Sequence, residues 1–206
     1  MNFEYSYPDM SCTPKSTLDM RFEHPACHLH DGVSGSGKTF RVAQILRLKN
    51  EILKNGEQIK NVVFCYATWQ PVYFLLQQEN TVSQWINMIP SVDDFVRMVE
   101  PYKNCGGSLV IIDDFMGHIT PGMDEIVRVH SRHNNTSTFL LFQSLFPAQK
   151  LSRNISLNMR YIHVYKNPRE NSQFGYLARQ IMPQGYKWLV QAYYEATKKS
   201  IFCISS

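Results

Sequence analysis

The segment GVSGSGKT, residues 32–39, constrains this chain more than any other feature. It has the spacing G-x-x-x-x-G-K-[ST], which ends here on Lys38 and Thr39. Its glycines let backbone N–H groups turn inward around phosphate oxygens, at torsion angles that a Cβ would resist. The apolar spacing of residues 39–55 predicts a helix directly after the loop, whose N-terminus favours an anion. The segment therefore predicts a P-loop.

The residue types in this loop predict how a nucleotide would be held. Lys38 is expected to neutralise charge on the β- and γ-phosphates, and the hydroxyl of Thr39 to ligate Mg²⁺. A Ser/Gly loop can match the motif by chance, and the strand expected before it, residues 26–31, is less apolar than usual. The predicted ATP-binding residues are Gly32, Ser34, Gly35, Ser36, Gly37, Lys38, Thr39 and Phe40.

The length and composition indicate one ordinary globular domain. The chain has 206 residues, of which 44% are hydrophobic and 18% charged. We expect an N-terminal arm over residues 1–22 and a single ATPase domain over residues 23–206. The net charge of +4 permits contact with nucleic acid, but it would equally suit a metabolic enzyme.

The cysteines and the apolar segments favour an intracellular protein. The five cysteines are an odd number without regular spacing, which argues against a disulfide framework. The N-terminal segment lacks the apolar core of a signal peptide, so secretion is not expected. No run of about 18 apolar residues occurs, so no membrane-spanning segment is expected.

Strands and helices are predicted to alternate along the chain, which indicates a mostly parallel sheet with helices on both faces. The expected strands are residues 26–31, 61–66, 108–112, 138–142 and 160–165, with a last strand beginning over 201–204. The expected helices are residues 39–55, 71–78, 81–88, 92–99, 124–133, 171–181 and 188–198.

The segment LVIIDD, residues 109–114, is an apolar strand that ends in two carboxylates, Asp113 and Asp114, as a Walker B motif does. Asp113 would hold the hydration shell of Mg²⁺, and Asp114 would orient or deprotonate the attacking water. Taken alone, the same residues would suit an acidic turn after a core strand.

Gln143 follows the strand TFLLF. Because the carboxyl ends of parallel strands meet at one edge of a sheet, Gln143 is expected beside the P-loop and Asp113. Its amide can hydrogen-bond both water and the γ-phosphate. A polar strand end facing solvent would explain the same residue.

Several segments, in order, resemble the FtsK–HerA superfamily, specifically the viral genome-packaging ATPases of poxvirus type, and most closely their polinton-like and adintovirus-like versions. The resemblance extends from about Phe22 to Lys199. Two departures stand out: Ser144 replaces a frequent Asn, and HSRHNN replaces a frequent His-His-Arg cluster. The matching segments are FEHP, FCYATWQPVY, LVIIDDFM, TFLLFQSLFP and RNISLNMRYIHVYKNPRENSQ.

The resemblance implies a RecA-like, catalytic-glutamate-type strand order and a motor that translocates double-stranded DNA into a capsid. Such a motor is a homo-oligomeric ring, pentamer or hexamer, docked on viral capsid vertex proteins in an infected cell or associated with the virion. A neighbouring subunit would supply an arginine to the γ-phosphate. Arg132 is the first candidate and Arg153 the second, and an ordinary surface role is open for both. Lys103 and Asn104 are candidates for DNA contact.

Other interpretations are a nucleotide or nucleoside kinase, another P-loop NTPase, or a weakly hydrolysing, nucleotide-gated assembly protein. A Zn²⁺ site at His24, Cys27, His28 and His30 is disfavoured because Cys27 would point opposite to His28 and His30 on a strand. Four aromatic residues are expected to pack in the core, with adenine contact as the alternative. They are Tyr66, Trp69, Tyr73 and Phe74.

Overall fold

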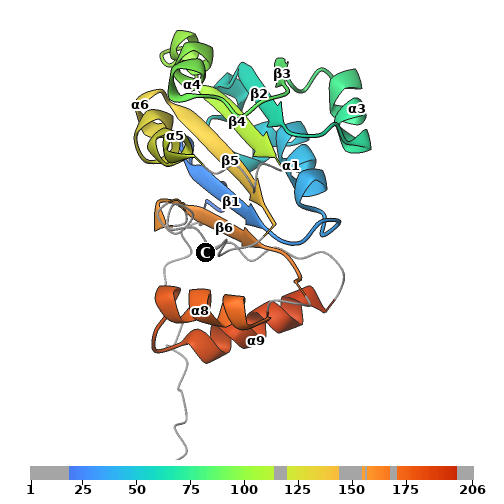
Figure 1. Ribbon diagram of the computed structural model, residues 1–206, viewed down its shortest axis with the longest axis vertical. Helices are drawn as coiled ribbons and strands as arrows, with labels where there is room; N and C mark the ends of the chain where they lie inside the picture. Colours follow the sequence, from blue (N-terminus) through green and yellow to red (C-terminus); the bar gives the residue numbers. More distant parts are fainter. Residues whose placement is uncertain (1–18, 114–119, 144–154, 156, 168–170, 199–206) are drawn as a thin grey trace, which may run out of the picture.

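The computed structural model describes residues 19–113, 120–143, 155, 157–167 and 171–198. A six-stranded sheet crosses its centre, and all the strand pairs are parallel (Figure 1). The strand order is β3-β2-β4-β5-β1-β6. The strands are β1 (Cys27–Asp31), β2 (Asn61–Tyr66), β3 (Gln84–Ile86), β4 (Ser108–Asp113), β5 (Thr136–Phe142) and β6 (Tyr161–Val164).

Helices cover both faces of the sheet, as predicted (Figure 1). Apolar residues of α1 and α3 pack with one strand face, and those of α4, α5, η5, α8 and α9 pack with the other. The α-helices are α1 (Lys38–Arg47), α2 (Lys49–Ile52), α3 (Pro71–Gln78), α4 (Val92–Val99), α5 (Pro121–Glu125), α6 (Ser131–His133), α8 (Asn171–Ile181) and α9 (Tyr186–Thr197). Two short 3₁₀-helices, η2 (Gly56–Gln58) and η3 (Glu100–Tyr102), and a π-helix, η5 (Ile126–His130), complete the set.

The strand order confirms the predicted RecA-like arrangement, because β5 lies between β1 and β4. The register also aligns the ends of these three strands: Asp31 pairs with Phe142, and Asp113 pairs with Leu141. The residues that follow β1, β4 and β5 therefore leave the sheet at one edge. No helix in the described part of the chain is long and apolar enough to cross a membrane.

Residues 81–88 were predicted as a helix, and this prediction is wrong. They contain the edge strand β3, which pairs with Val63, Phe64 and Cys65 of β2. Trp85 stacks on Phe64 with ring centroids 5.1 Å apart. Tryptophan and isoleucine suit a half-buried pleated surface, but so short a run has no period that separates strand from helix.

The helix predicted over residues 39–55 is shorter than expected. It divides at Leu48 into α1 and α2, and Leu53 has an extended backbone. The backbone of Phe22 pairs with the residues on either side of Leu53. Its N–H donates to the Ile52 carbonyl (2.8 Å), and its carbonyl accepts from the Lys54 N–H (2.9 Å). Leu53 itself is fully buried. Pairing with the incoming N-terminal segment ends the helix, and local periodicity carries no sign of it.

The helix predicted over residues 124–133 is present as three successive pieces, α5, η5 and α6. The central piece is a π-helix, and the hydroxyl of Ser131 donates to the carbonyl of Ile126 at 2.9 Å. The strand expected to begin over residues 201–204 lies outside the described residues.

Candidate functional site

The predicted P-loop leaves the sheet between β1 and α1, and two of its glycines are required by its geometry. Gly37, the N-cap of α1, has a φ of 93°, where a Cβ would be strained by about 1–2 kcal/mol. A Cβ on Gly32 would lie 2.6 Å from the Cβ of Tyr165. Gly32 also donates its N–H to the Phe142 carbonyl at 3.1 Å, which anchors the loop to β5. The loop is therefore held in shape before any ligand binds.

Neutral side chains support the loop from behind. Tyr165 packs against Gly32, and its hydroxyl lies 2.9 Å from Nδ1 of His30. Burial lowers the pKa of His30 well below its usual value, and His163, His28, Arg41 and Lys38 add to that effect. A neutral imidazole at this position adds no positive charge behind the cationic loop.

Lys38 lies in the first turn of α1 and is 8% exposed. Its ammonium group donates to the carbonyl of Gly32 and, at 3.0 Å, to that of Val33. The loop's own oxygens thus hold the cation beside the N-terminus of α1. This position places the charge where the motif predicts the β- and γ-phosphates.

Thr39, Tyr73 and Asp113 meet at a single carboxylate oxygen. The Thr39 hydroxyl donates to Oδ2 of Asp113 at 2.9 Å, and the Tyr73 hydroxyl donates to the same oxygen at 2.7 Å. Tyr73 is fully buried and Asp113 is 2% exposed, so little water competes for these bonds. Hydroxyl and carboxylate oxygens are the ligands that Mg²⁺ prefers, so the donor set of Thr39 and Asp113 fits this ion.

A cavity of about 260 Å³ joins the loop to the ends of β4 and β5. Asp113 and Gln143 line it together with Gln70 and Val72, which stand at the N-terminus of α3. Every predicted nucleotide-binding residue except Gly32 and Ser36 lines it too. Phe40 contributes a side chain that is 47% exposed. The structure thus brings a phosphate loop, a buried carboxylate and an amide into one space.

Two of the predicted catalytic residues, Asp114 and Arg153, lie outside the described residues. A third, Arg132, lies far from the cavity of its own chain. It lines a separate pocket with Cys27, at the beginning of β1, whereas the P-loop follows the end of that strand. Five strand residues rise about 3.3 Å each, so β1 alone separates the two places by about 15 Å. Arg132 therefore does not belong to the cavity formed by its own P-loop.

Tyr73 is the site residue that sequence reasoning missed. It was grouped with Tyr66, Trp69 and Phe74 as core, and its burial confirms that part of the prediction. Trp69 and Phe74 are 43% and 54% exposed, so a core position is wrong for both. Tyr73 and Asp113 are far apart in the sequence, and only the packing of α3 on the sheet brings the two side chains together. Nothing local to Tyr73 distinguished it from a packing tyrosine.

The histidine and cysteine residues of β1 face opposite sides of the sheet, as predicted. Cys27 belongs to the core beneath α4, α5 and η5, whereas His28 stacks on Phe139 with ring centroids 4.2 Å apart. Phe139 belongs to the core on the other face. Within the described ranges, no group of three or more His, Cys, Asp or Glu side chains is arranged to hold a metal ion.

Solved structures of low sequence identity share this fold. The genome packaging NTPase B204 from Sulfolobus turreted icosahedral virus 2, in complex with sulfate, is 17% identical, with a TM-score of 0.58 over 88% of this chain and 90% of that one. Its complex with ATP-gammaS is 16% identical, with a TM-score of 0.56 over 87% and 91%. The cytoplasmic domain of the Type VII secretion ATPase EccC of Thermomonospora curvata is 10% identical, with a TM-score of 0.51 over 71% and 20%.

The comparisons by sequence give no relative. No protein-family model matches the chain. No curated protein sequence matches it either. The structural likeness and the strand order together show that the chain has the fold of the P-loop NTPases.

Proposed function

We propose that this protein hydrolyses ATP and uses the energy to move double-stranded DNA into a viral capsid. The observation that carries the proposal is the single cavity lined by the P-loop, by Asp113 and by Gln143. The packaging NTPase of similar fold supports the assignment to genome packaging. The sequence resemblance to the FtsK–HerA superfamily supports it independently.

The phosphates of ATP would lie over the loop and the N-terminus of α1. The backbone N–H groups of the loop would donate to the phosphate oxygens there, and the helix end would add a positive potential. Lys38 would exchange its bonds to the carbonyls of Gly32 and Val33 for bonds to phosphate oxygens. The exchange keeps the buried ammonium group hydrogen-bonded before and after binding.

Thr39 and Asp113 would hold Mg²⁺ at the phosphates. When bound, this ion neutralises charge that develops on the phosphoryl oxygens. Tyr73 keeps the carboxylate of Asp113 oriented toward Thr39, because its hydroxyl donates to the oxygen that also accepts from Thr39. Preorganised oxygen ligands reduce the reorganisation that ion binding requires.

The attacking water would be oriented by Gln143 at the end of β5, with Asp114 as the group that polarises or deprotonates it. Gln143 lines the nucleotide cavity, and its amide can bond both water and phosphate. Asp114 follows β4 directly, after the ion-binding Asp113. The proton would pass from the water to a carboxylate as the β–γ bond breaks.

Arg132 would act on the nucleotide of a neighbouring subunit. Its place at the opposite edge of the sheet excludes its own cavity and leaves it accessible to a second copy. A ring of five or six copies would pair each P-loop with the arginine of a neighbour, and Arg153 is the second candidate for that role. Lys103 and Asn104, which precede β4, are exposed candidates for DNA contact.

A direct test is ATPase activity with and without double-stranded DNA of arbitrary sequence, measured together with sedimentation in the presence of ATP. The proposal expects stimulation by DNA and assembly of a ring. The variant Arg132→Ala should bind ATP but hydrolyse it poorly. Phosphate transfer to a nucleoside in place of water, or a protein that stays monomeric under all conditions, would contradict the proposal.

A further inference from the structure

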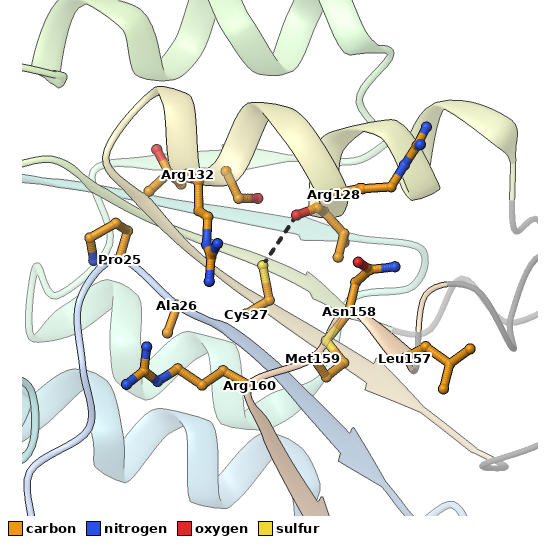
Figure 2. A pocket seen from close by; sticks show the side chains of 12 residues that line it. Pro25, Ala26, Cys27, Arg128, Arg132, Leu157, Asn158, Met159 and Arg160 are labelled. Atoms are coloured by element: carbon orange, nitrogen blue, oxygen red, sulfur yellow. Dashed lines mark hydrogen bonds between the residues drawn. The ribbon is translucent and has the colours of Figure 1, made fainter.

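A second pocket of about 310 Å³ lies at the opposite end of the sheet from the nucleotide cavity (Figure 2). Its floor includes Ala26 and Cys27, where the chain enters β1, and one wall is the helical segment that carries Arg128 and Arg132. The other wall is the segment that enters β6 and carries Arg160. Thr136, at the start of β5, also lines the pocket, which is therefore built from separate parts of the chain.

The arginines of the pocket do not point the same way. Figure 2 shows Arg132 extending from its helix into the pocket, and Arg160 extending along the opposite wall toward the same side, near Pro25 and Ala26. Arg128 extends away from the pocket, and its guanidinium lies 3.6 Å from the carboxylate of Asp124. Two cationic groups thus face one space, while the third is paired outside it.

Both arginines bring positive charge to the pocket, and both are exposed to solvent. Arg132 and Arg160 come from different elements, and no ion pair with an acidic residue is formed by either within the described part of the chain. An oxyanion bound between them would accept the paired N–H groups of each guanidinium.

The π-helix η5 sets the direction of Arg132. The hydroxyl of Ser131 donates to the carbonyl of Ile126 and lies 2.7 Å from the hydroxyl of Thr138 in β5. A π-turn adds a residue to the helical turn, and this extra residue rotates every side chain that follows it, including that of Arg132. Such insertions are frequent at functional sites. Here one buried hydroxyl, that of Ser131, bonds both to the helical segment and to Thr138 of the sheet, which fixes the insertion.

We propose that Arg132 and Arg160 form a clamp for a phosphate oxyanion. Two sources share this chemistry: a phosphodiester of the DNA backbone, and the terminal phosphate of a nucleotide on a neighbouring copy. The second source rests on the ring proposed above, whereas the first does not.

The first arm of the test measures binding of a fluorescein-labelled duplex by anisotropy without nucleotide, across a salt series. If the clamp holds a backbone phosphate, Arg160→Gln and Arg132→Gln each weaken binding and reduce the salt slope by about 1. Arg128→Gln, which points away, and Arg97→Gln on α4, which is 77% exposed, are matched controls that should bind like the unaltered protein. An unchanged melting temperature would show that each variant is folded.

The second arm mixes variants that lack opposite halves of a shared site. If the ligand is a neighbour's nucleotide, the clamp variants bind the duplex as the unaltered protein does. A mixture of Lys38→Ala and Arg160→Gln then regains ATPase activity that neither variant has alone. If both clamp variants match Arg97→Gln in duplex binding and in the mixing assay, the clamp is overturned. An active Lys38→Ala protein would instead contradict the proposed function, and it would leave the duplex measurement readable.

Discussion

We propose one anion site at the carboxyl ends of the parallel strands and another at their amino ends, and the two sites would hold an anion by different means. Below, these are called the carboxyl edge and the opposite edge of the sheet. At the carboxyl edge the P-loop offers backbone N–H groups and one nearly buried cation, Lys38, within a few consecutive residues. At the opposite edge, Arg132 and Arg160 offer long, exposed side chains from different elements. The first site is formed largely by the consecutive residues of one loop. The second depends on side chains from separate parts of the chain, which the fold brings to one pocket.

The largest expected effect separates the two edges. Lys38→Ala removes the cation from the nucleotide cavity, and the ATPase rate should fall about 10²–10³-fold, as for the loss of one charge-stabilising donor. Binding of free duplex should stay unchanged, because Lys38 lies far from the arginine pocket. Lys60→Ala, an exposed lysine on the loop before β2, serves as the control. A fall in duplex binding for Lys38→Ala would break the distinction between the edges.

The next effect is the pH dependence of stability that His163, in strand β6, confers on the sheet. Burial lowers the pKa of His163 to about 4, and Arg41 adds to that effect. In the unfolded chain the pKa is about 6.5, so the unfolded state binds more protons between these values. The free energy of unfolding should therefore fall by up to about 3 kcal/mol as the pH drops from about 6.5 to about 4. Above about pH 6.5 the full contribution of the neutral His163 is present.

Urea unfolding measured at neutral pH and at about pH 5 checks this contribution. His163→Gln can still bond to Nδ1 of His28, which lies 3.2 Å from Nε2 of His163. The variant should lose stability less steeply on acidification than the unaltered protein. The control His133→Gln, at an exposed position, should lose stability as steeply as the unaltered protein. Equal slopes for His163→Gln and the unaltered protein would contradict the assignment.

A smaller effect tests preorganisation at the carboxyl edge. Tyr73→Phe removes the hydroxyl that donates to Asp113 and should weaken Mg²⁺ binding by about 1.5–3 kcal/mol, the usual range for a hydrogen bond to a charged group. The measurement is the Mg²⁺ dependence of nucleotide binding, followed by tryptophan fluorescence because Trp69 and Trp85 pack near Tyr73. Tyr66→Phe, in the same aromatic group, is the matched control. If the two variants behave alike, the hydroxyl has no positioning role.

The smallest effects compare two glycines. Gly37→Ala should weaken nucleotide binding by up to about 1–2 kcal/mol, because the alanine lets the free loop relax away from the φ of 93° and binding must then restore this strained angle. Gly175→Ala, within α8 and with no atom near the added Cβ, should raise the free energy of unfolding by about 0.5–1 kcal/mol and leave binding unchanged. Calorimetry of nucleotide binding and thermal unfolding measure the two outcomes. Unchanged binding by Gly37→Ala would show that the loop keeps its torsion angles with alanine, so that the strain lowers only the free energy of unfolding.

Sequence patterns predicted most of the fold because most of its signals are local. The parallel strands and the helices of residues 71–78, 92–99 and 171–181 follow from periodicity and turn residues, and the structure has them. The failures lie where distant segments decide. The edge strand β3 depends on pairing with β2, and the early end of the helix predicted over residues 39–55 depends on pairing with Phe22.

The sequence by itself determined the phosphate loop, because the torsion angles, the N–H groups, the lysine and the helix start all lie within residues 32–39. It also identified Asp113 and Gln143 as strand-end residues. Only the tertiary structure decided that Tyr73 supports Asp113, and that Arg132 lines one pocket with Arg160, away from its own P-loop. These contacts join residues far apart in the chain, and the order and register of the parallel strands determine which of them meet.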